Sequence, residues 1–213
     1  MAKKRFGTDI RREQIAEAAL EIVRSQGIKS LNLAAVAEKM DMVPSALYRH
    51  FKSKNEIVTA VLELIGIRLS AHFQQVVNQD MDPLEKLRVL LMRHIEMICG
   101  NNAIPRLIFS EEVIGGHPER RQQLFGIIEK VLENVATIIR DGQSRGIIRG
   151  DLPAKNLAVS FLGMIQPAAI IWNLSSGEFD LLHHSQAAWK LFSDSLHPNF
   201  CNIGVQAGVQ KKK

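Results

Sequence analysis

Residues 31–54, LNLAAVAEKMDMVPSALYRHFKSK, constrain the fold most, because they contain two short helical patterns separated by a tight break. Asn32 suits the N-cap of the first helix. The apolar residues of that helix recur at helical spacing: Leu33, Val36, Ala37 and Met40. Residues 41–43 form the turn. Pro44 then suits the first position of a second helix, where its missing N–H costs nothing.

The second helix, SALYRHF, has an apolar inner side and a polar outer side. Leu47 and Phe51 share its inner face at i, i+4. The remaining side chains point away from the core: Ser45, Ala46, Tyr48 and Arg49. The major groove of B-DNA admits a short helix with small, hydroxyl and cationic groups at its N-terminal end. The pattern therefore predicts a helix-turn-helix that reads DNA.

This region resembles the DNA-binding domain of the TetR/AcrR family of bacterial transcriptional regulators, over roughly residues 8–68. The matching positions are Arg11, Ile15, Ala18, Ala19, Gly27, Val36, Ala37, residues 46–51 and Lys54. Two positions differ from the commonest family pattern. Asp41 stands where glycine is usual in the turn, and Val43 stands where serine often caps the recognition helix. Since Asp tolerates the left-handed conformation, we expect these differences to affect which bases are read and not the fold.

The resemblance implies roles for individual residues on double-stranded DNA. Tyr48, His50 and Lys54 match phosphate-contacting positions, whereas Pro44, Ser45 and Ala46 match positions near base edges. Near the N-terminus, we expect a mobile arm that reaches the minor groove or the backbone. The complete predicted DNA-binding set is Lys3, Lys4, Arg5, Asn32, Pro44, Ser45, Ala46, Tyr48, Arg49, His50 and Lys54.

The charge of the chain is concentrated in this region. Residues 1–54 carry 11 Lys/Arg against 6 Asp/Glu, a net +5, while residues 55–213 carry 16 against 16. The full net charge of +5 therefore lies in the DNA-binding head. A basic patch confined to one part of a chain is the electrostatic signature of nucleic-acid binding.

Helical periodicity continues through the rest of the chain, and no β-type alternation competes with it. The first helix is predicted to begin with Thr8 as N-cap and to end at Gly27 in the left-handed conformation, with a buried stripe of Ile15, Ala18, Ala19, Ile22 and Val23. Ser53 and Glu56 form a capping box that opens a long helix. The helices expected from there on are 53–79, 82–99, 105–113, 117–145, 153–174 and 183–196.

The predicted fold is all-α. A three-helix DNA-binding head is joined by a long helix to an all-helical ligand-binding and dimerisation body. The domain boundaries are 8–68 for the head, with the helix-turn-helix at about 31–50, and 69–200 for the body. Residues 201–213 lack a core-forming pattern and are predicted to be a disordered tail.

The resemblance implies a homodimer formed by the last two helices, 154–175 and 183–197. Small residues in the first of them, Ala158, Gly163, Ala168 and Ala169, permit close approach of helices. The predicted interface set is Ala168, Trp172, Ala188, Trp189, Leu191 and Phe192. The alternative is that the same residues form the internal core of a monomer. A dimer fits a palindromic operator, whose half-sites lie about one helical turn apart.

The resemblance also implies a ligand pocket inside the body. Polar residues on otherwise apolar helices and nearby aromatic residues are the candidates: His94, Arg106, Phe109, Phe161, Gln166, Trp172 and Asn173. Buried polar groups satisfied by the protein, or surface residues, explain the same pattern. The apolar walls favour a small hydrophobic effector. Pro167 is expected to kink its helix.

Other classes of protein have weaker support. The N-terminus lacks the apolar segment of a signal peptide, and no uninterrupted apolar run approaches the ~18 residues of a membrane span, which predicts a cytoplasmic protein with no membrane partner. The histidines show no i, i+4 pair, so no metal site is expected, and no cofactor is expected either. Cys99 reads as an inert core thiol. The adjacent pair Glu111 and Glu112 lacks an accompanying nucleophile or base, so an enzyme is not predicted.

These observations predict a sequence-specific DNA-binding transcriptional regulator, a repressor released from a palindromic operator by a small hydrophobic ligand. The alternative is a DNA-binding regulator or DNA-organising protein of the same fold that has no small-molecule effector. For the repressor, helix 53–79 is the predicted lever between body and DNA, and residues 105–113 are its predicted pivot. Arg106, Phe109 and Glu112 are expected to transmit the movement.

Overall fold

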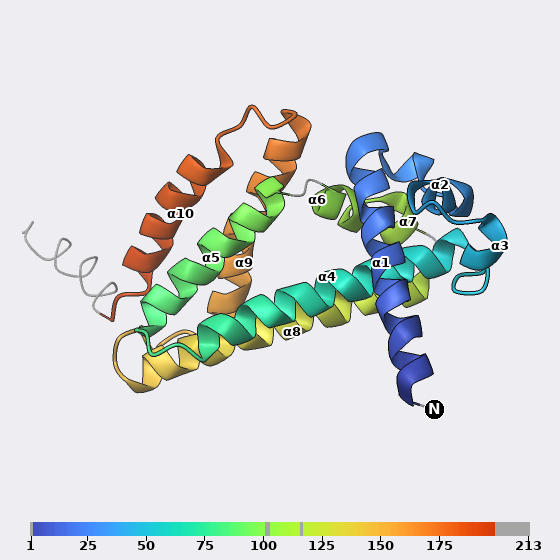
Figure 1. Ribbon diagram of the computed structural model, residues 1–213. Coiled ribbons are helices and arrows are strands. Elements are labelled where there is room, and N and C mark those ends of the chain that lie inside the picture. Colours follow the sequence, from blue (N-terminus) through green and yellow to red (C-terminus); the bar gives the residue numbers. More distant parts are fainter. Residues whose placement is uncertain (1, 101–102, 116, 199–213) are drawn as a thin grey trace, which may run out of the picture. The chain divides into compact units, whose positions relative to one another are not determined.

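The computed structural model describes the backbone of residues 2–100, 103–115 and 117–198, and the side chains from Ile10 onward. Within these ranges the chain forms helices and no strand (Figure 1), which confirms the predicted all-α class. The chain divides into two compact units. The first comprises Met1–Ser70 and Ile98–Ile128, and the second comprises Ala71–Met97 and Glu129–Lys213. The predicted tail at 201–213 lies outside the described residues.

The first unit contains the helix-turn-helix and the helices that support it. Its elements are α1 (Ala2–Gln26), the 3-10 helix η1 (Ile28–Ser30), α2 (Leu33–Lys39), α3 (Pro44–Leu47), the first part of α4 (Lys54–Val77), α6 (Ala103–Ile108), α7 (Glu111–Ile114) and the start of α8 (Pro118–Ser144). A buried stripe of α1 forms the centre of this unit, and Ile15, Ala19 and Val23 are completely inaccessible to solvent. Burial of Ile15 and of Val23 contributes roughly 1.5–3 kcal/mol each. An ion pair between Glu17 of α1 and Arg68 of α4 adds a polar link.

Three predicted boundaries in this unit are wrong: the start of the first helix, the end of the recognition helix, and the single helix at 105–113. The first helix begins at Ala2 and not after Thr8, because Lys and Arg are good helix formers and no proline interrupts the run. Its first residues, Lys3, Lys4 and Arg5, therefore continue the helix and do not form a separate arm, although their side chains lie outside the described set.

The recognition helix is shorter than predicted, and the segment at 105–113 is divided. Helix α3 ends at Leu47, and residues 48–50 form a turn closed by the bond from His50 N to Leu47 O at 2.8 Å. The single predicted piece at 105–113 is two helices, α6 and α7, separated at Ser110. The Ser110 hydroxyl donates to Leu107 O at 2.6 Å, which terminates α6 locally.

The second unit is built from longer helices. It contains the end of α4, most of α5 (Pro83–Gly100), the larger part of α8, α9 (Ala154–Leu174) and α10 (Leu181–Ser195). Gly146, with φ of +67°, ends the α8 segment as predicted, because a left-handed residue is needed there. Asp180, which the sequence analysis overlooked, caps α10 by accepting a hydrogen bond from His183 N at 2.9 Å.

Helices α9 and α10 run antiparallel and pack closely on each other (Figure 1). Their shared core contains Ala158, Phe161, Ile165 and Phe192, all at most 8% exposed. Pro167 lies inside α9 as predicted. Cys99, at the end of α5, is exposed, so its assignment to the core is wrong. The apolar neighbours of Cys99 in the sequence suggested burial, but the residue is next to last in α5 and remains exposed there.

Candidate nucleic-acid interface

The helix-turn-helix is fixed by caps and turns that lie close together in sequence. The side chain of Asn32 caps α2 by accepting a hydrogen bond from Ala35 N at 2.9 Å. Asp41 has φ of +52°, the left-handed conformation that the turn requires at this position. Pro44 occupies the first turn of α3, while Val43 before it makes no side-chain cap bond. These features confirm the local predictions for Asn32, Asp41 and Pro44.

The recognition helix presents a polar outer face. Leu47 and Phe51 are both completely buried, as predicted from their i, i+4 spacing. Pro44, Ser45, Tyr48 and Arg49 are exposed, and Ala46 is partly exposed. Tyr48 is 56% exposed, a high value for an aromatic residue. This face is therefore free to enter a groove and contact bases.

A cluster of cations surrounds the end of the recognition segment. His50 lies near Arg49 on its own segment and near Arg11 and Arg12 on α1, and its ring Nδ1 is buried with no hydrogen-bond partner. Arg12 donates to His50 O at 2.8 Å and lies 4.3 Å from the centre of the Phe51 ring. Burial and then the three guanidinium groups lower the pKa of His50 below its ordinary value.

The contribution of α1 to this cluster was missed in the sequence analysis. Arg11 appeared there only as a position matching the family, and Arg12 was not considered. The adjacent Arg11-Arg12 pair in a helix that precedes a helix-turn-helix was the available signal. The structure brings both guanidinium groups to the end of the recognition segment, where they extend the positive charge beyond α3.

Lys54 begins α4 immediately after the recognition segment. Ser53 Oγ accepts from Glu56 N at 3.3 Å, so Ser53 caps α4 as predicted. The Glu56 carboxylate accepts from Lys52 N at 2.9 Å, one residue before the position expected for a capping box. The ammonium group of Lys54 donates to Ile28 O and to Glu112 Oε1, each at 3.2 Å. Lys54 thus has protein partners in this structure.

The residues predicted to bind ligand fall into both units. Arg106 and Phe109 belong to the first unit, and both are exposed. The second unit contains His94, Phe161, Gln166, Trp172 and Asn173. Phe161 is only 2% exposed because it packs on Phe192, whereas Gln166, Trp172 and Asn173 are half-buried. Burial and then the nearby His72 lower the pKa of His94 to about 4.

The residues predicted for the dimer interface differ in their accessibility. Ala168 and Phe192 are 2% and 8% exposed, so they belong to the chain's own core. Trp172, Ala188 and Trp189 are half-buried, while Leu191 is 74% exposed.

Helix α9 is long and apolar enough in composition to cross a membrane, with a mean hydropathy of 1.6 over its most apolar window, one third of which is buried. Core helices pass the same test.

A helix-turn-helix with an exposed cationic reading face, within an all-helical chain, defines a DNA-binding regulator. Residues 15–61 match the bacterial regulatory proteins of the tetR family, and residues 63–195 match the YsiA-like protein C-terminal region. The chain belongs to the tetR family of bacterial regulatory proteins, and its C-terminal part is of the YsiA-like type.

Three relatives span nearly the whole described chain. The nucleoid occlusion factor SlmA of Vibrio vulnificus is 22% identical over 86% of this chain and 94% of its own length. The crystal structure of FadR from Bacillus subtilis in complex with stearoyl-CoA is 20% identical, with a TM-score of 0.73 over 86% of this chain and 98% of that one. Thermus thermophilus FadR in complex with lauroyl-CoA is 18% identical, with a TM-score of 0.63 over 87% of this chain and 94% of that one.

Proposed function

We propose that this chain is a dimeric transcriptional repressor that leaves its palindromic operator when its body binds a long-chain acyl-CoA. The observation that carries the DNA-binding part is the exposed face of α3 beside the cationic cluster at His50. Pro44, Ser45 and Ala46 would approach base edges in the major groove. A protein acting in this way works in the cytoplasm, where the DNA is.

The phosphate contacts would surround this face. Tyr48, Arg49 and His50 are the contacts on the recognition segment, and Lys54 follows at the start of α4. Arg11 and Arg12 extend the set, because their guanidinium groups lie with that of Arg49 around His50. Each cation that meets a phosphate releases bound counterions from the DNA, so the affinity should fall steeply as salt is added.

The second copy of the chain would cover an exposed apolar surface on α9 and α10. Six large apolar side chains of these helices are 40–77% exposed: Val159, Ile170, Ile171, Leu174, Leu182 and Leu191. Patches of this kind on a soluble chain mark interaction surfaces. Val159, Ile170 and Leu174 also lie at helical spacing with the exposed Gly163, so one stripe of α9 is available for close packing of helices. This interface excludes Phe192, which the chain's own core already uses.

The acyl-CoA class is suggested by the two FadR structures, whose titles name stearoyl-CoA and lauroyl-CoA. The apolar composition of α9 suits an acyl chain. A ligand shifts an equilibrium only by its differential affinity for the two states, so the effector must bind better to the DNA-free form. Helix α4, 24 residues or ~36 Å long, carries Lys54 at one end and contributes residues from Ala71 onward to the second unit, so it is one of the helices that connect the two units.

A second candidate function is DNA organisation without a small-molecule effector. The similarity to the nucleoid occlusion factor SlmA over the same span favours it. The two candidates differ in one observable property, because only the repressor responds to an effector. A thermal-shift assay with stearoyl-CoA, and with free CoA as control, therefore separates them. Stabilisation by stearoyl-CoA alone supports the repressor, and the absence of stabilisation favours the organising role.

The DNA contacts have their own test. Arg49→Ala should weaken binding to all duplex sequences and reduce the salt slope by roughly one per head, as expected for a lost phosphate contact. Arg121→Ala, which removes the same charge from an exposed position on α8, is the matched control. If both variants lose affinity for DNA equally, Arg49 makes no phosphate contact of its own and the DNA interface does not include the recognition segment.

A further inference from the structure

The cation Lys54 is already paired with an acidic side chain of the same unit. Its ammonium group lies 3.2 Å from Glu112 Oε1 on α7, and it also donates to Ile28 O at 3.2 Å. Both ion-pair partners are partly accessible, with 32% of the Lys54 side chain and 26% of the Glu112 side chain exposed. Water and counterions can therefore reach the pair, so exchanging one anionic partner for another requires no opening of the core.

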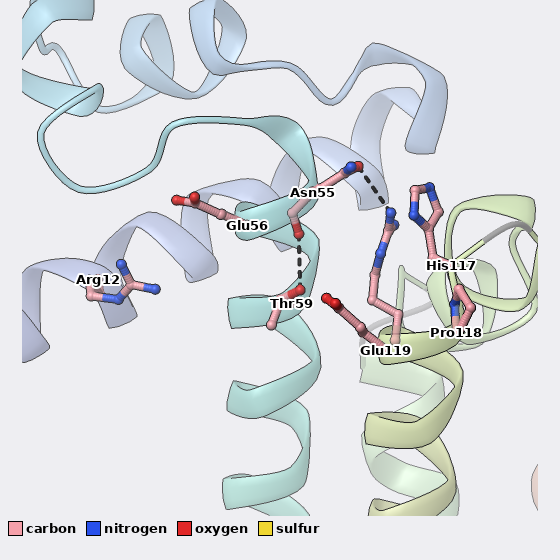
Figure 2. Close-up of a pocket in the computed structure, with 8 residues that line it drawn as sticks. Arg12, Asn55, Glu56, Thr59, His117, Pro118 and Glu119 are labelled. Carbon is pink, nitrogen blue, oxygen red and sulfur yellow. Dashed lines mark hydrogen bonds between the residues drawn. The ribbon is translucent and has the colours of Figure 1, made fainter.

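Glu112 is held in place through its own backbone. Arg120, only 3% exposed, donates from Nη1 to the carbonyl of Glu112 and from Nη2 to Asn55 Oδ1 at 3.0 Å. Figure 2 draws the second of these bonds as a dashed line, at the edge of a cleft of about 520 Å³. The short helix α7 and the first turn of α4 are thus tied to one buried guanidinium group.

The Glu112 carboxylate keeps two other stabilising groups, its own backbone N–H and the charge of Arg120, when Lys54 leaves it. Burial raises the pKa of this carboxyl, but its own backbone N–H, Lys54 and the charge of Arg120 outweigh that effect, and the net pKa is lowered. Arg120 stays in place because it is buried and makes two other bonds. Transfer of Lys54 to another anion would therefore leave the partly exposed Glu112 carboxylate beside Arg120, and would avoid the isolated buried charge that makes breaking a buried ion pair costly.

We propose that Glu112 is an internal competitor for DNA phosphate, holding Lys54 in the DNA-free protein and releasing it when DNA binds. This inference rests on the proposed phosphate contact of Lys54. It gives α7 a regulatory role, because any movement that presses Glu112 toward Lys54 weakens DNA binding and any movement that withdraws it strengthens binding. Arg120 is then a positioning residue that sets where Glu112 stands.

The test compares two adjacent glutamates on the same helix. Glu112→Gln and Glu111→Gln remove the same charge from neighbouring positions, so their long-range effects on DNA are matched. Glu111 is exposed and has no ion pair with Lys54. Affinity for a short random-sequence duplex is measured by fluorescence anisotropy, since a phosphate contact is independent of sequence. We expect Glu112→Gln to bind about two- to fivefold more tightly per head than Glu111→Gln, the range typical of a partly exposed ion pair.

The same comparison in a Lys54→Ala background completes a double-mutant cycle. In that background the two glutamine variants should bind DNA alike, because Glu112 no longer has the Lys54 ammonium group to compete for. If Lys54→Ala itself leaves DNA affinity unchanged, the proposed phosphate contact of Lys54 fails. If Lys54→Ala weakens binding but Glu112→Gln matches Glu111→Gln, the contact stands and the competition is wrong. Weaker binding by Glu112→Gln would mean that Glu112 prepares Lys54 for DNA, which also overturns the proposal.

Folding is checked independently. Circular dichroism melts should show that the glutamine variants unfold at similar temperatures, since Gln retains the size of Glu. Glu112→Asp provides a second variant that keeps the charge but shortens the side chain by one carbon. It should bind DNA with an affinity between those of the parent protein and Glu112→Gln. An affinity equal to that of the parent protein would show that contact between Glu112 and Lys54 does not limit DNA binding.

Discussion

Phe161 of α9 and Phe192 of α10 meet edge to face, with ring centres 5.9 Å apart and ring planes at 61°. Both are buried, at 2% and 8% exposure, and the ring of Trp189 also lies near Phe192, with ring centres 6.3 Å apart. Aromatic pairs in this geometry contribute beyond the burial of their area. The contact therefore joins the last two helices within one chain.

Replacing Phe192 by Ala should lower the free energy of unfolding by about 3–4 kcal/mol, through lost burial and a cavity against Phe161. Urea denaturation followed by circular dichroism measures the change. Phe125→Ala is the control, because Phe125 on α8 is 60% exposed and lies outside the proposed dimer interface, so its truncation should change stability by no more than about 0.5 kcal/mol. Similar midpoints for the two variants would show that Phe192 is not part of the core.

Dimerisation is tested at an exposed residue of α9. Leu174 is 77% exposed, so Leu174→Glu should leave the fold of the chain intact while placing a charge in the proposed interface. We expect monomers by light scattering and far weaker operator binding, since two linked heads bind more tightly than one. Phe125→Glu, at a 60% exposed position on α8, should remain dimeric. A folded, fully dimeric Leu174→Glu variant would place the interface elsewhere.

The pKa of His94 predicts a loss of stability in mild acid. Burial and His72 lower this pKa to about 4 in the folded protein, below the ordinary value of 6.5 that applies when unfolded. The unfolded chain therefore binds the proton more readily between these values. The stabilisation from neutral His94 is complete above pH of about 6.5 and is lost as the pH falls toward 4, amounting to roughly 2 kcal/mol between pH 7 and pH 5.

Thermal denaturation at these two pH values, with His94→Gln for comparison, isolates this contribution. The carboxylates titrate in both proteins, so only the difference between them reports on His94. The variant should lose less stability between pH 7 and pH 5 than the parent protein. Equal losses would show that His94 is accessible enough to titrate normally.

The cap of α2 gives a prediction for the reading head. Asn32→Ala removes the hydrogen bond to Ala35 N and should cost about 1 kcal/mol of stability. Asn32→Ser retains a capping oxygen and should cost at most a few tenths of a kcal/mol of stability. Amide hydrogen exchange at residues 33–37 measures the local effect. Protection unchanged in the Ala variant would mean that α2 is held by packing alone.

The features predicted correctly from sequence are those set by near neighbours. The cap at Asn32, the capping role of Ser53 and the turn at Asp41 each depend on residues within four positions of one another. The buried pair Leu47 and Phe51 follows from helical periodicity. Such local rules placed the helix-turn-helix and most of the helices without any knowledge of tertiary contacts.

The features that were missed depend on distant parts of the chain. Arg120 is one of several charged residues at the start of α8, and its partner Asn55 lies 65 positions away, so nothing local in the sequence marks it. Phe192 and Leu191 are adjacent and both apolar, yet one faces the core and the other faces solvent. Both had been assigned to the dimer interface, because the pattern identifies apolar faces but cannot say which partner covers each face.

The most direct test of the central claim is a DNase footprint of the protein on the DNA upstream of its own gene, with and without stearoyl-CoA. The account predicts a protected palindrome whose half-sites lie about one helical turn apart. Protection should disappear when stearoyl-CoA is added and persist with free CoA. A footprint that stearoyl-CoA leaves unchanged would contradict ligand-released repression, and the absence of any protected palindrome would contradict sequence-specific binding by paired heads.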